Sequence, residues 1–399
     1  MDKERRIFGL KKNVFQMGLV SLFNEFSNEM IQSVMPVFLA VSLGVPPVGV
    51  GLIEGVADAV SSFVRIFSGW LSDKINHRKL PAILGYVLSV STRPLFMLAA
   101  SFTHVLVLRS ADRVGKGFRE PPRDALLSDS AGKQELGKSF GYHRGIDAVG
   151  GIMAPLAAFF ILPFINYNYR TLFFIAFCIG LLAILGFVFV KEIKRPENEK
   201  PKRLNIGLLK ENPPFCLFIA AIFLFGLGVL PITLMLLRPM EIGLVVTNVP
   251  LLYFVYFAIF VLAAFPLGKL ADRIGERVVI SVGFLAIIIA YASLAFSTQI
   301  IFSVAAFMFL GLYSAATDGI GRALAAKLIS HEMLATGQGL LNAAVGFSSL
   351  LAGAIGGLLW TVFNAQVAFL YAICMASVGL MMFLYISFIR PLPQVVKTK

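Results

Sequence analysis

Long runs of apolar residues alternate along the chain with short polar turns. A helix of about 20 residues spans the hydrocarbon core of a bilayer, so each of these runs is long enough to cross a membrane. Twelve spans are predicted, at residues 14–43, 48–71, 80–101, 103–127, 136–163, 168–190, 214–238, 245–269, 277–296, 300–327, 335–361 and 366–390. The pattern therefore predicts an all-α membrane protein with twelve transmembrane helices.

A long polar stretch at residues 191–213 divides these spans six and six. We therefore expect an amino-terminal bundle at 14–190, a cytoplasmic linker at 191–213 and a carboxyl-terminal bundle at 214–390. The halves also resemble each other. Gly69-Trp-Leu-Ser-Asp73 matches Gly268-Lys-Leu-Ala-Asp272 at an offset of 199, and Asp124-Ala-Leu matches Arg322-Ala-Leu at an offset of 198. Two six-helix repeats in parallel orientation are a recurring plan of transporters, which bind their cargo near the bilayer midplane between the repeats.

Composition and charge support a membrane location. Of the 399 residues 58% are hydrophobic and only 14% are charged, a balance that excludes an ordinary soluble domain. The net charge of +13 would suggest nucleic acid in a soluble chain, but the Lys and Arg residues concentrate in the termini and in alternate turns, whereas the turns at 44–47, 101–104 and 297–299 carry no charge. This positive-inside bias predicts that both termini are cytoplasmic and that no nucleic acid is bound.

Charged residues recur within the predicted spans at helical spacing. They form stripes on the fourth span (Arg109, Asp112, Arg113, Lys116, Glu120, Arg123), the second (Glu54, Asp58, Ser61, Arg65), the first (Asn24, Glu25, Asn28, Glu29, Gln32) and the fifth (His143, Asp147, beside Arg144). A charge at the bilayer centre costs about 2.5–3.5 kcal/mol even on the scale derived from translocon insertion, so these residues need partners or a hydrated cavity. The carboxyl-terminal half has only Asp318 and Arg322 at such spacing.

Two interpretations of these charges stay open. They could pair with one another and fix the packing of the helices. Alternatively, carboxylates that change surroundings between two states could carry protons, and the cations could orient an anionic cargo. On the second interpretation the proton carriers are Glu25, Glu29, Glu54, Asp58, Asp112 and Asp147, with Glu29 and Asp58 favoured, and the cavity residues are Asn28, Arg109, Arg113, Lys116, Arg144, Asp318 and Arg322.

The turns after the second and eighth spans carry the repeated motif and are predicted to act as cytoplasmic latches. The latch residues are Gly69, Asp73 and Arg78, with Asp124 of the fourth span, in the first half and Gly268, Asp272 and Arg277 in the second. Glycine lets helices approach closely, and the basic residues lie at the expected level of the lipid phosphates. Pro121-Pro122 predict either a hinge or a plain helix end on the fourth span.

The paired turns resemble the signature of the major facilitator superfamily. The second copy is complete, whereas the first has Asn76 and His77 at positions where the pattern prefers Gly and a base. Arg109 followed by Gly115 and Gly117 resembles the fourth-helix motif of the superfamily, and the segment from Asp112 to Leu126 resembles a prokaryotic subgroup of mostly unassigned substrate. The resemblance implies a monomeric twelve-helix secondary transporter of a cytoplasmic membrane that works by alternating access.

Motifs for other chemistry are missing from the sequence. No phosphate-binding Gly-x-x-x-x-Gly-Lys-Ser/Thr run occurs, so ATP is not expected to drive the protein. The four His residues lack metal-ligand spacing, and Cys178, Cys216 and Cys374 stand singly in apolar segments. We expect no enzyme activity, no metal and no cofactor.

Three functions remain open at this point. A proton-coupled transporter could export drugs or metabolites, or it could import an organic nutrient or a metal chelate such as a siderophore. The dense basic residues of the fourth span favour an anionic cargo. A protein of the same fold could also act as a membrane receptor or assembly partner without transport, in which case its charge stripes would be fully paired and dry.

Overall fold

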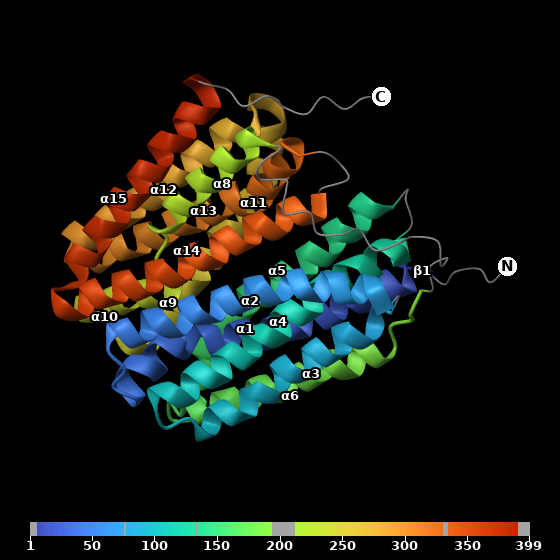
Figure 1. Ribbon diagram of the computed structural model, residues 1–399. Helices are drawn as coiled ribbons and strands as arrows, with labels where there is room; N and C mark the ends of the chain where they lie inside the picture. The colour runs from blue at the N-terminus through green and yellow to red at the C-terminus, as the bar shows by residue number, and fades with distance from the viewer. Residues whose placement is uncertain (1–5, 76, 132–134, 194–211, 330–333, 390–399) are drawn as a thin grey trace. The chain divides into compact units, whose positions relative to one another are not determined.

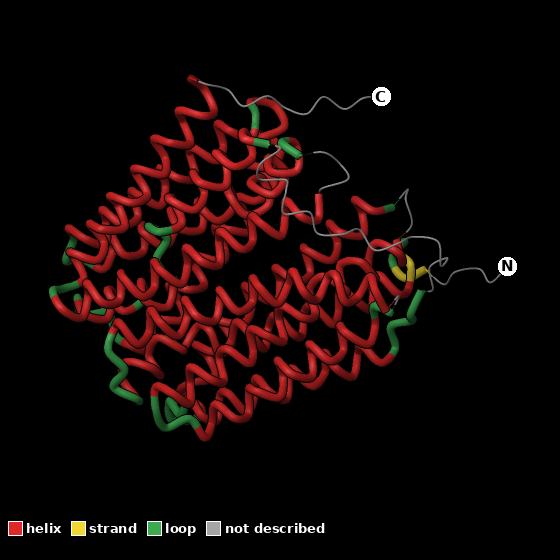
Figure 2. Tube along the Cα trace, viewed as in Figure 1, coloured by secondary structure: helices red, strands yellow, loops and turns green. Residues whose placement is uncertain are grey.

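A computed structural model of the chain describes residues 6–75, 77–131, 135–193, 212–329 and 334–389, without the side chains of Trp70, Asp73, Lys74, Leu334 and Ala335. Within these residues the fold is helical apart from one short antiparallel hairpin, formed by β1 (Arg6–Ile7) and β2 (Leu10–Lys11) (Figure 2). Most of the predicted linker, residues 194–211, lies outside the described part of the chain.

The helices of the first half correspond to the six predicted spans (Figure 1). They are α1 (Lys12–Val37), extended by η1 (Phe38–Ser42), then α2 (Pro47–Ile75), α3 (Lys79–Leu95), extended by η2 (Phe96–Leu98), then α4 (Phe102–Ala131), α5 (Leu136–Phe164) and α6 (Tyr169–Val188).

The helices of the second half also follow the predicted spans. They are α8 (Pro213–Gly226), α9 (Ile232–Met235), α10 (Leu237–Glu241), η3 (Val246–Asn248), α11 (Val249–Ile274), α12 (Glu276–Phe296), α13 (Ile300–Lys327), α14 (Leu334–Val362) and α15 (Ala365–Leu384), extended by η5 (Tyr385–Ile389). Across the described residues of both halves, eight helices are long and apolar enough to cross a membrane. The charged helices α1, α2 and α4 are not among these eight.

The structure divides into two compact units. One contains Met1–Leu43 and Val60–Pro201, and the other contains Gly44–Ala59 and Lys202–Lys399. The first half of α2 therefore packs with the second unit, where Gly51 and Gly353 bring α2 and α14 into backbone contact and the Val48 N–H donates to Thr361 Oγ1 at 2.9 Å. The bundle boundaries predicted from the sequence stay a prediction.

Helix packing repeats from one unit to the other. In the first unit α1 packs on α5 and α6, and α3 packs on α4 and α6. In the second unit α8 packs on α14 and α15, and α12 packs on α13 and α15. Each pairing in one unit has its counterpart six spans later in the other. The repeat found in the sequence is therefore also present in the packing.

α4 continues through Pro121-Pro122 to Ala131, so the predicted helix end at these prolines is wrong, whereas the alternative of a hinge stays a prediction. A proline inside a helix leaves the carbonyl four residues earlier without its N–H donor. The Phe118 carbonyl, which Pro122 leaves unpaired, instead accepts a hydrogen bond of 2.5 Å from Ser68 Oγ on α2. The neighbouring helix thus supplies the missing donor.

The seventh predicted span, residues 214–238, is interrupted. α8 ends at Gly226, and helix resumes only at Ile232, after Pro231. Non-helical backbone at membrane depth is tolerated where protein groups satisfy its polar atoms. Here the Leu230 N–H donates to the Tyr291 hydroxyl of α12 at 2.9 Å, and both residues are buried.

Candidate functional site

The polar stripe of α1 faces the interior of the first unit. Asn24, Asn28, Glu29 and Gln32 are buried, and Glu25 is half-buried. Asn28 Nδ2 donates to Glu29 Oε1 at 2.7 Å. Buried polar side chains of this kind need hydrogen-bond partners, which neighbouring helices supply in the clusters described next.

A charge cluster joins α1, α3 and α4. Arg109 Nη1 lies 3.4 Å from Asp112 Oδ2, and its Nη2 donates to the amide oxygen of Gln32. Ser89 Oγ donates to the other Asp112 oxygen. Arg109 and Asp112 are 1% and 4% exposed, so this ion pair is almost fully desolvated. The cluster brings together three residues that the sequence placed on two separate stripes.

Arg93 extends this polar interior and was missed in the sequence analysis. It is 1% exposed on α3, and its Nη2 donates to Asn24 Oδ1 at 2.8 Å. Its Nη1 has no hydrogen-bond partner among the described residues. The only sequence signal was a lone basic residue inside an apolar run, one turn after Ser89.

Arg119 is a second buried guanidinium that is incompletely paired. It is 2% exposed and lies over the ring of Tyr86, with 5.0 Å between the guanidinium carbon and the ring centroid. Within the described part of the chain its Nε and Nη1 have no hydrogen-bond partner. A cation over an aromatic face is attracted by the ring quadrupole, but this leaves in-plane N–H donors unused. The first unit therefore holds more buried donors than it satisfies.

Two glycines of α4 set how closely α2 and α3 approach this cluster. A Cβ added at Gly115 would lie 2.7 Å from the Gly85 carbonyl oxygen of α3, and one added at Gly117 would lie 2.6 Å from the Ser61 carbonyl oxygen of α2. The two glycines flank Lys116 in the sequence and contact different helices. Small residues at such contacts let helix backbones approach closely.

Replacing Gly115 by leucine is expected to destabilise the protein by about 1–3 kcal/mol or more, because the added side chain would separate α3 from α4. Gly141→Leu is the matched control, since a Cβ at Gly141 would meet no described atom within 4 Å beyond its own stretch of helix. Thermal unfolding of both purified variants tests this. Equal stability of the two variants would contradict the close contact.

The stripe on α2 is divided between the two units. Arg65 Nη2 pairs with Glu120 Oε2 of α4 at 2.8 Å within the first unit. Glu54 is buried in the second unit, where Asp58 accepts a hydrogen bond from Ser349 of α14 at 3.2 Å. Asp58 and Glu29, the two favoured proton carriers, therefore lie in different units.

The polar face of α5 meets α1. His143 Nε2 and Ser21 Oγ are 2.7 Å apart, and both side chains are buried. One turn later Asp147 is half-buried and lies within electrostatic range of Glu25, because Gly150 seats α5 closely on α1. Arg144 is exposed, but it also lies within electrostatic range of His143 and Asp147.

The remaining cations of α4 lie near the same interior. Arg113 is buried and Lys116 is half-buried. Arg123 is buried, and its Nε and Nη2 bind Asp124 Oδ1 at 3.0 and 2.9 Å. The predicted latch residue Asp124 thus pairs with its neighbour in sequence. In the second unit Asp318 and Arg322 of α13 pair at 3.0 Å, and both side chains are about half exposed.

At the first predicted latch, acidic side chains bind the turn between α2 and α3. Arg78 Nη1 pairs with Asp129 Oδ2 near the end of α4 at 2.9 Å, and the side chains are 7% and 11% exposed. The Glu192 carboxylate accepts from the backbone N–H groups of Arg78 and Lys79, at 3.1 and 2.6 Å. Gly69 approaches Pro121 of α4, whereas the Asp73 side chain lies outside the described residues.

The second predicted latch repeats this arrangement with opposite charges. Glu276 binds Lys327, and both residues lie 198 positions after Arg78 and Asp129, the pair of the first unit. Arg277 Nη1 donates to the Ser387 carbonyl oxygen at 2.8 Å. Asp272 is exposed, and a Cβ at Gly268 would meet no other helix within 4 Å in the described part of the chain. The two turns are thus equivalent in position but differ in their charges and contacts.

The family is shown by comparison with known proteins. The Major Facilitator Superfamily model matches residues 17–253 and 232–399. The chain belongs to this superfamily. An uncharacterized MFS-type transporter of Methanocaldococcus jannaschii is 30% identical over 383 residues, which cover 94% of this chain and 95% of the relative. The quinolone resistance protein NorA of Staphylococcus aureus is 25% identical over 206 residues, 51% of this chain and 50% of that protein.

Solved structures show the same facilitator fold. The nucleoside transporter NupG has a TM-score of 0.78 at 14% identity, covering 94% of this chain and 98% of its own. The peptide transporter POT in complex with sulfate has a TM-score of 0.77 at 14% identity, covering 97% and 96%. This facilitator chain is therefore a multi-pass membrane protein of a transporter family. Among its described residues, no three His, Cys, Asp or Glu side chains lie close enough to hold a metal ion.

Proposed function

We propose that the protein is a proton-coupled secondary transporter that moves a small organic solute with an anionic group across the cytoplasmic membrane of a prokaryote by alternating access. The observation that carries the proposal is the buried charge network of the first unit, in which Arg93 and Arg119 keep N–H donors that no described residue accepts from. Unsatisfied buried donors cost free energy, and an anionic cargo is the group that would satisfy them.

In this proposal carboxylates on α1, α2, α4 and α5 carry the protons. The candidates remain Glu25, Glu29, Glu54, Asp58, Asp112 and Asp147. Glu29 is the first choice in the first unit, because it is buried and its Oε1 accepts from a neutral amide donor, Asn28. Asp112 is held by both Arg109 and Ser89. It is better suited to hold the arginine in place.

The proposal also assigns the orientation, partners and latches. Both termini lie in the cytoplasm, the working form is a monomer in the lipid bilayer, and the boundaries of the two rocking bundles lie at 14–190 and 214–390. The turn clusters around Arg78 and Arg277 hold the cytoplasmic ends of their bundles. Both clusters join the ends of neighbouring helices, as a latch requires.

Transport assays with reconstituted protein test the proposal. Vesicles carrying the full chain and an imposed pH gradient should accumulate at least one organic anion from a panel spanning both charge signs, and a protonophore should abolish this. If no solute of either sign moved, the proposal would fail.

Export of amphipathic drugs is a second candidate, and the similarity of half the chain to the quinolone resistance protein NorA favours it. Import of a nutrient or metal chelate is the competing direction. A deletion strain separates them. Export predicts drug sensitivity, whereas import predicts slow growth under nutrient or iron starvation.

A receptor without transport is the remaining alternative. It requires charge stripes that are fully paired and dry. The incompletely paired Arg93 and Arg119 speak against that requirement. For such a receptor, Glu29→Gln would leave activity intact and harm only folding.

A further inference from the structure

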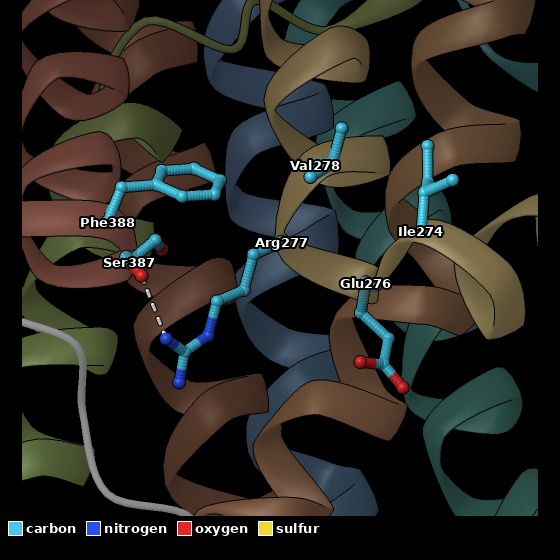
Figure 3. A pocket seen from close by; sticks show the side chains of 7 residues that line it. Ile274, Glu276, Arg277, Val278, Ser387 and Phe388 are labelled. Atoms are coloured by element: carbon cyan, nitrogen blue, oxygen red, sulfur yellow. Dashed lines mark hydrogen bonds between the residues drawn. The ribbon is translucent and has the colours of Figure 1, made fainter.

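A pocket of about 400 Å³ lies where the turn between α11 and α12 meets η5. Figure 3 shows Arg277 between Ser387 and Glu276, with Phe388 and Val278 beside it. Gly275 makes the turn possible, because its φ of 96° is a conformation that residues with a side chain rarely adopt. The pocket lies at the end of the second unit that carries the repeated motif.

The pocket contains a fixed cation. Arg277 Nη1 donates to the Ser387 carbonyl oxygen at 2.8 Å, which holds the guanidinium against η5 (Figure 3). A guanidinium presents a planar fork of N–H donors that matches the oxygens of a phosphate. Among the described residues that line the pocket, Glu276 has the only carboxylate, and Lys327 binds it. The pocket therefore favours an anion.

Apolar side chains border this cation. Ile274 is 48% exposed and Phe388 is 52% exposed, although both line the pocket. The next residue, Ile389, is 74% exposed. A free inorganic anion would gain nothing from this apolar border, whereas a lipid offers a phosphate and acyl chains together. The observations therefore favour a lipid over a soluble phosphate.

We propose that this pocket binds the phosphodiester headgroup of an anionic phospholipid, with Arg277 at the phosphate and Ile274 and Phe388 against the upper acyl chain. The proposal rests on the orientation given under the proposed function, which puts this turn at the cytoplasmic surface. Anionic lipids give that surface a negative potential, which attracts basic residues by about 1 kcal/mol each. Binding does not require transport, so the two proposals can fail separately.

The test uses a tryptophan reporter in the pocket. The full-length Phe388→Trp variant is reconstituted into bilayers of phosphatidylcholine and phosphatidylglycerol in which one or the other lipid carries brominated, quenching chains. The signal of the two native tryptophans is subtracted with the unchanged protein. The introduced indole should prefer phosphatidylglycerol by about fivefold, the factor that one basic residue supplies at such a surface.

Charge variants in the reporter background decide the outcome. Arg277→Gln should lower the preference to about one, whereas Arg277→Lys should keep most of it. Arg273→Gln is the matched control, because Arg273 is exposed in the last turn of α11 and is not among the described residues that line the pocket. Equal loss in both glutamine variants would overturn the site, and so would a preference in Arg277→Gln equal to that of the unchanged pocket. Displacement of the lipid by millimolar inorganic phosphate would overturn the lipid assignment in favour of a soluble anion.

Discussion

Asp112→Ala is expected to destabilise the protein by about 3–5 kcal/mol, because it removes the carboxylate from a buried ion pair with Arg109. Arg109 is 1% exposed, so it cannot turn to solvent once Asp112 is gone. Ser89 would also lose the acceptor of its hydroxyl. A loss of this size is a large part of the total stability of a typical domain.

The measurement is unfolding of the purified variants in one detergent. Asp318→Ala is the control, because its side chain is 56% exposed and its pair with Arg322 is a surface pair worth about 0–1 kcal/mol. The account expects a stability loss for Asp112→Ala several times that of the control. A similar loss in both variants would mean that water reaches the Arg109 guanidinium and that the pair is not desolvated.

Arg78→Glu is expected to cause the second large effect, a loss of about 3–5 kcal/mol from the buried pair with Asp129. The new carboxylate would face Asp129 and would also lie near Glu192, which accepts from the backbone N–H of Arg78. Two like charges would then replace an ion pair at the end of α4. Unfolding of the purified variant measures this loss.

The double variant Arg78→Glu with Asp129→Lys should recover about half of this loss, since paired residues couple in double-mutant cycles. It gives the first unit the charge order that Glu276 and Lys327 have in the second unit. Recovery stays incomplete because Glu192 remains nearby as a like charge. The loss of stability in the double variant is compared with the summed losses of Arg78→Glu and Asp129→Lys. If the two were equal, the two turns would not be equivalent latches.

The sequence predicts the spans well because the membrane leaves few alternatives. Backbone polar groups cannot remain unpaired in lipid, so long apolar runs must form helices. The predicted helix boundaries are wrong where another helix supplies a hydrogen bond to the backbone. α4 passes through Pro121-Pro122 because Ser68 bonds the freed Phe118 carbonyl, and the seventh span breaks where Tyr291 receives the Leu230 N–H. Neither donor–acceptor pair is local in sequence.

The candidate site could be predicted only in part, for the same reason. Helical spacing placed Arg109 and Asp112 on one stripe, and they form an ion pair in the structure. Spacing could not indicate that Ser89 and Gln32 complete the cluster, because these residues come from α3 and α1. Arg93 was missed because it belongs to no stripe. The roles of all these residues in transport stay predictions.

The central claim is that buried carboxylates of the first unit couple solute movement to protons. Its most direct test is solute-dependent proton uptake into vesicles that contain the full chain, recorded with an internal pH dye. Glu135→Gln is the control, because Glu135 pairs with Arg6 near the surface, outside the network. The account predicts that Glu29→Gln still binds solute but moves no proton with it, whereas Glu135→Gln behaves as the unchanged protein. Proton movement in Glu29→Gln equal to that of the unchanged protein would contradict the role of Glu29.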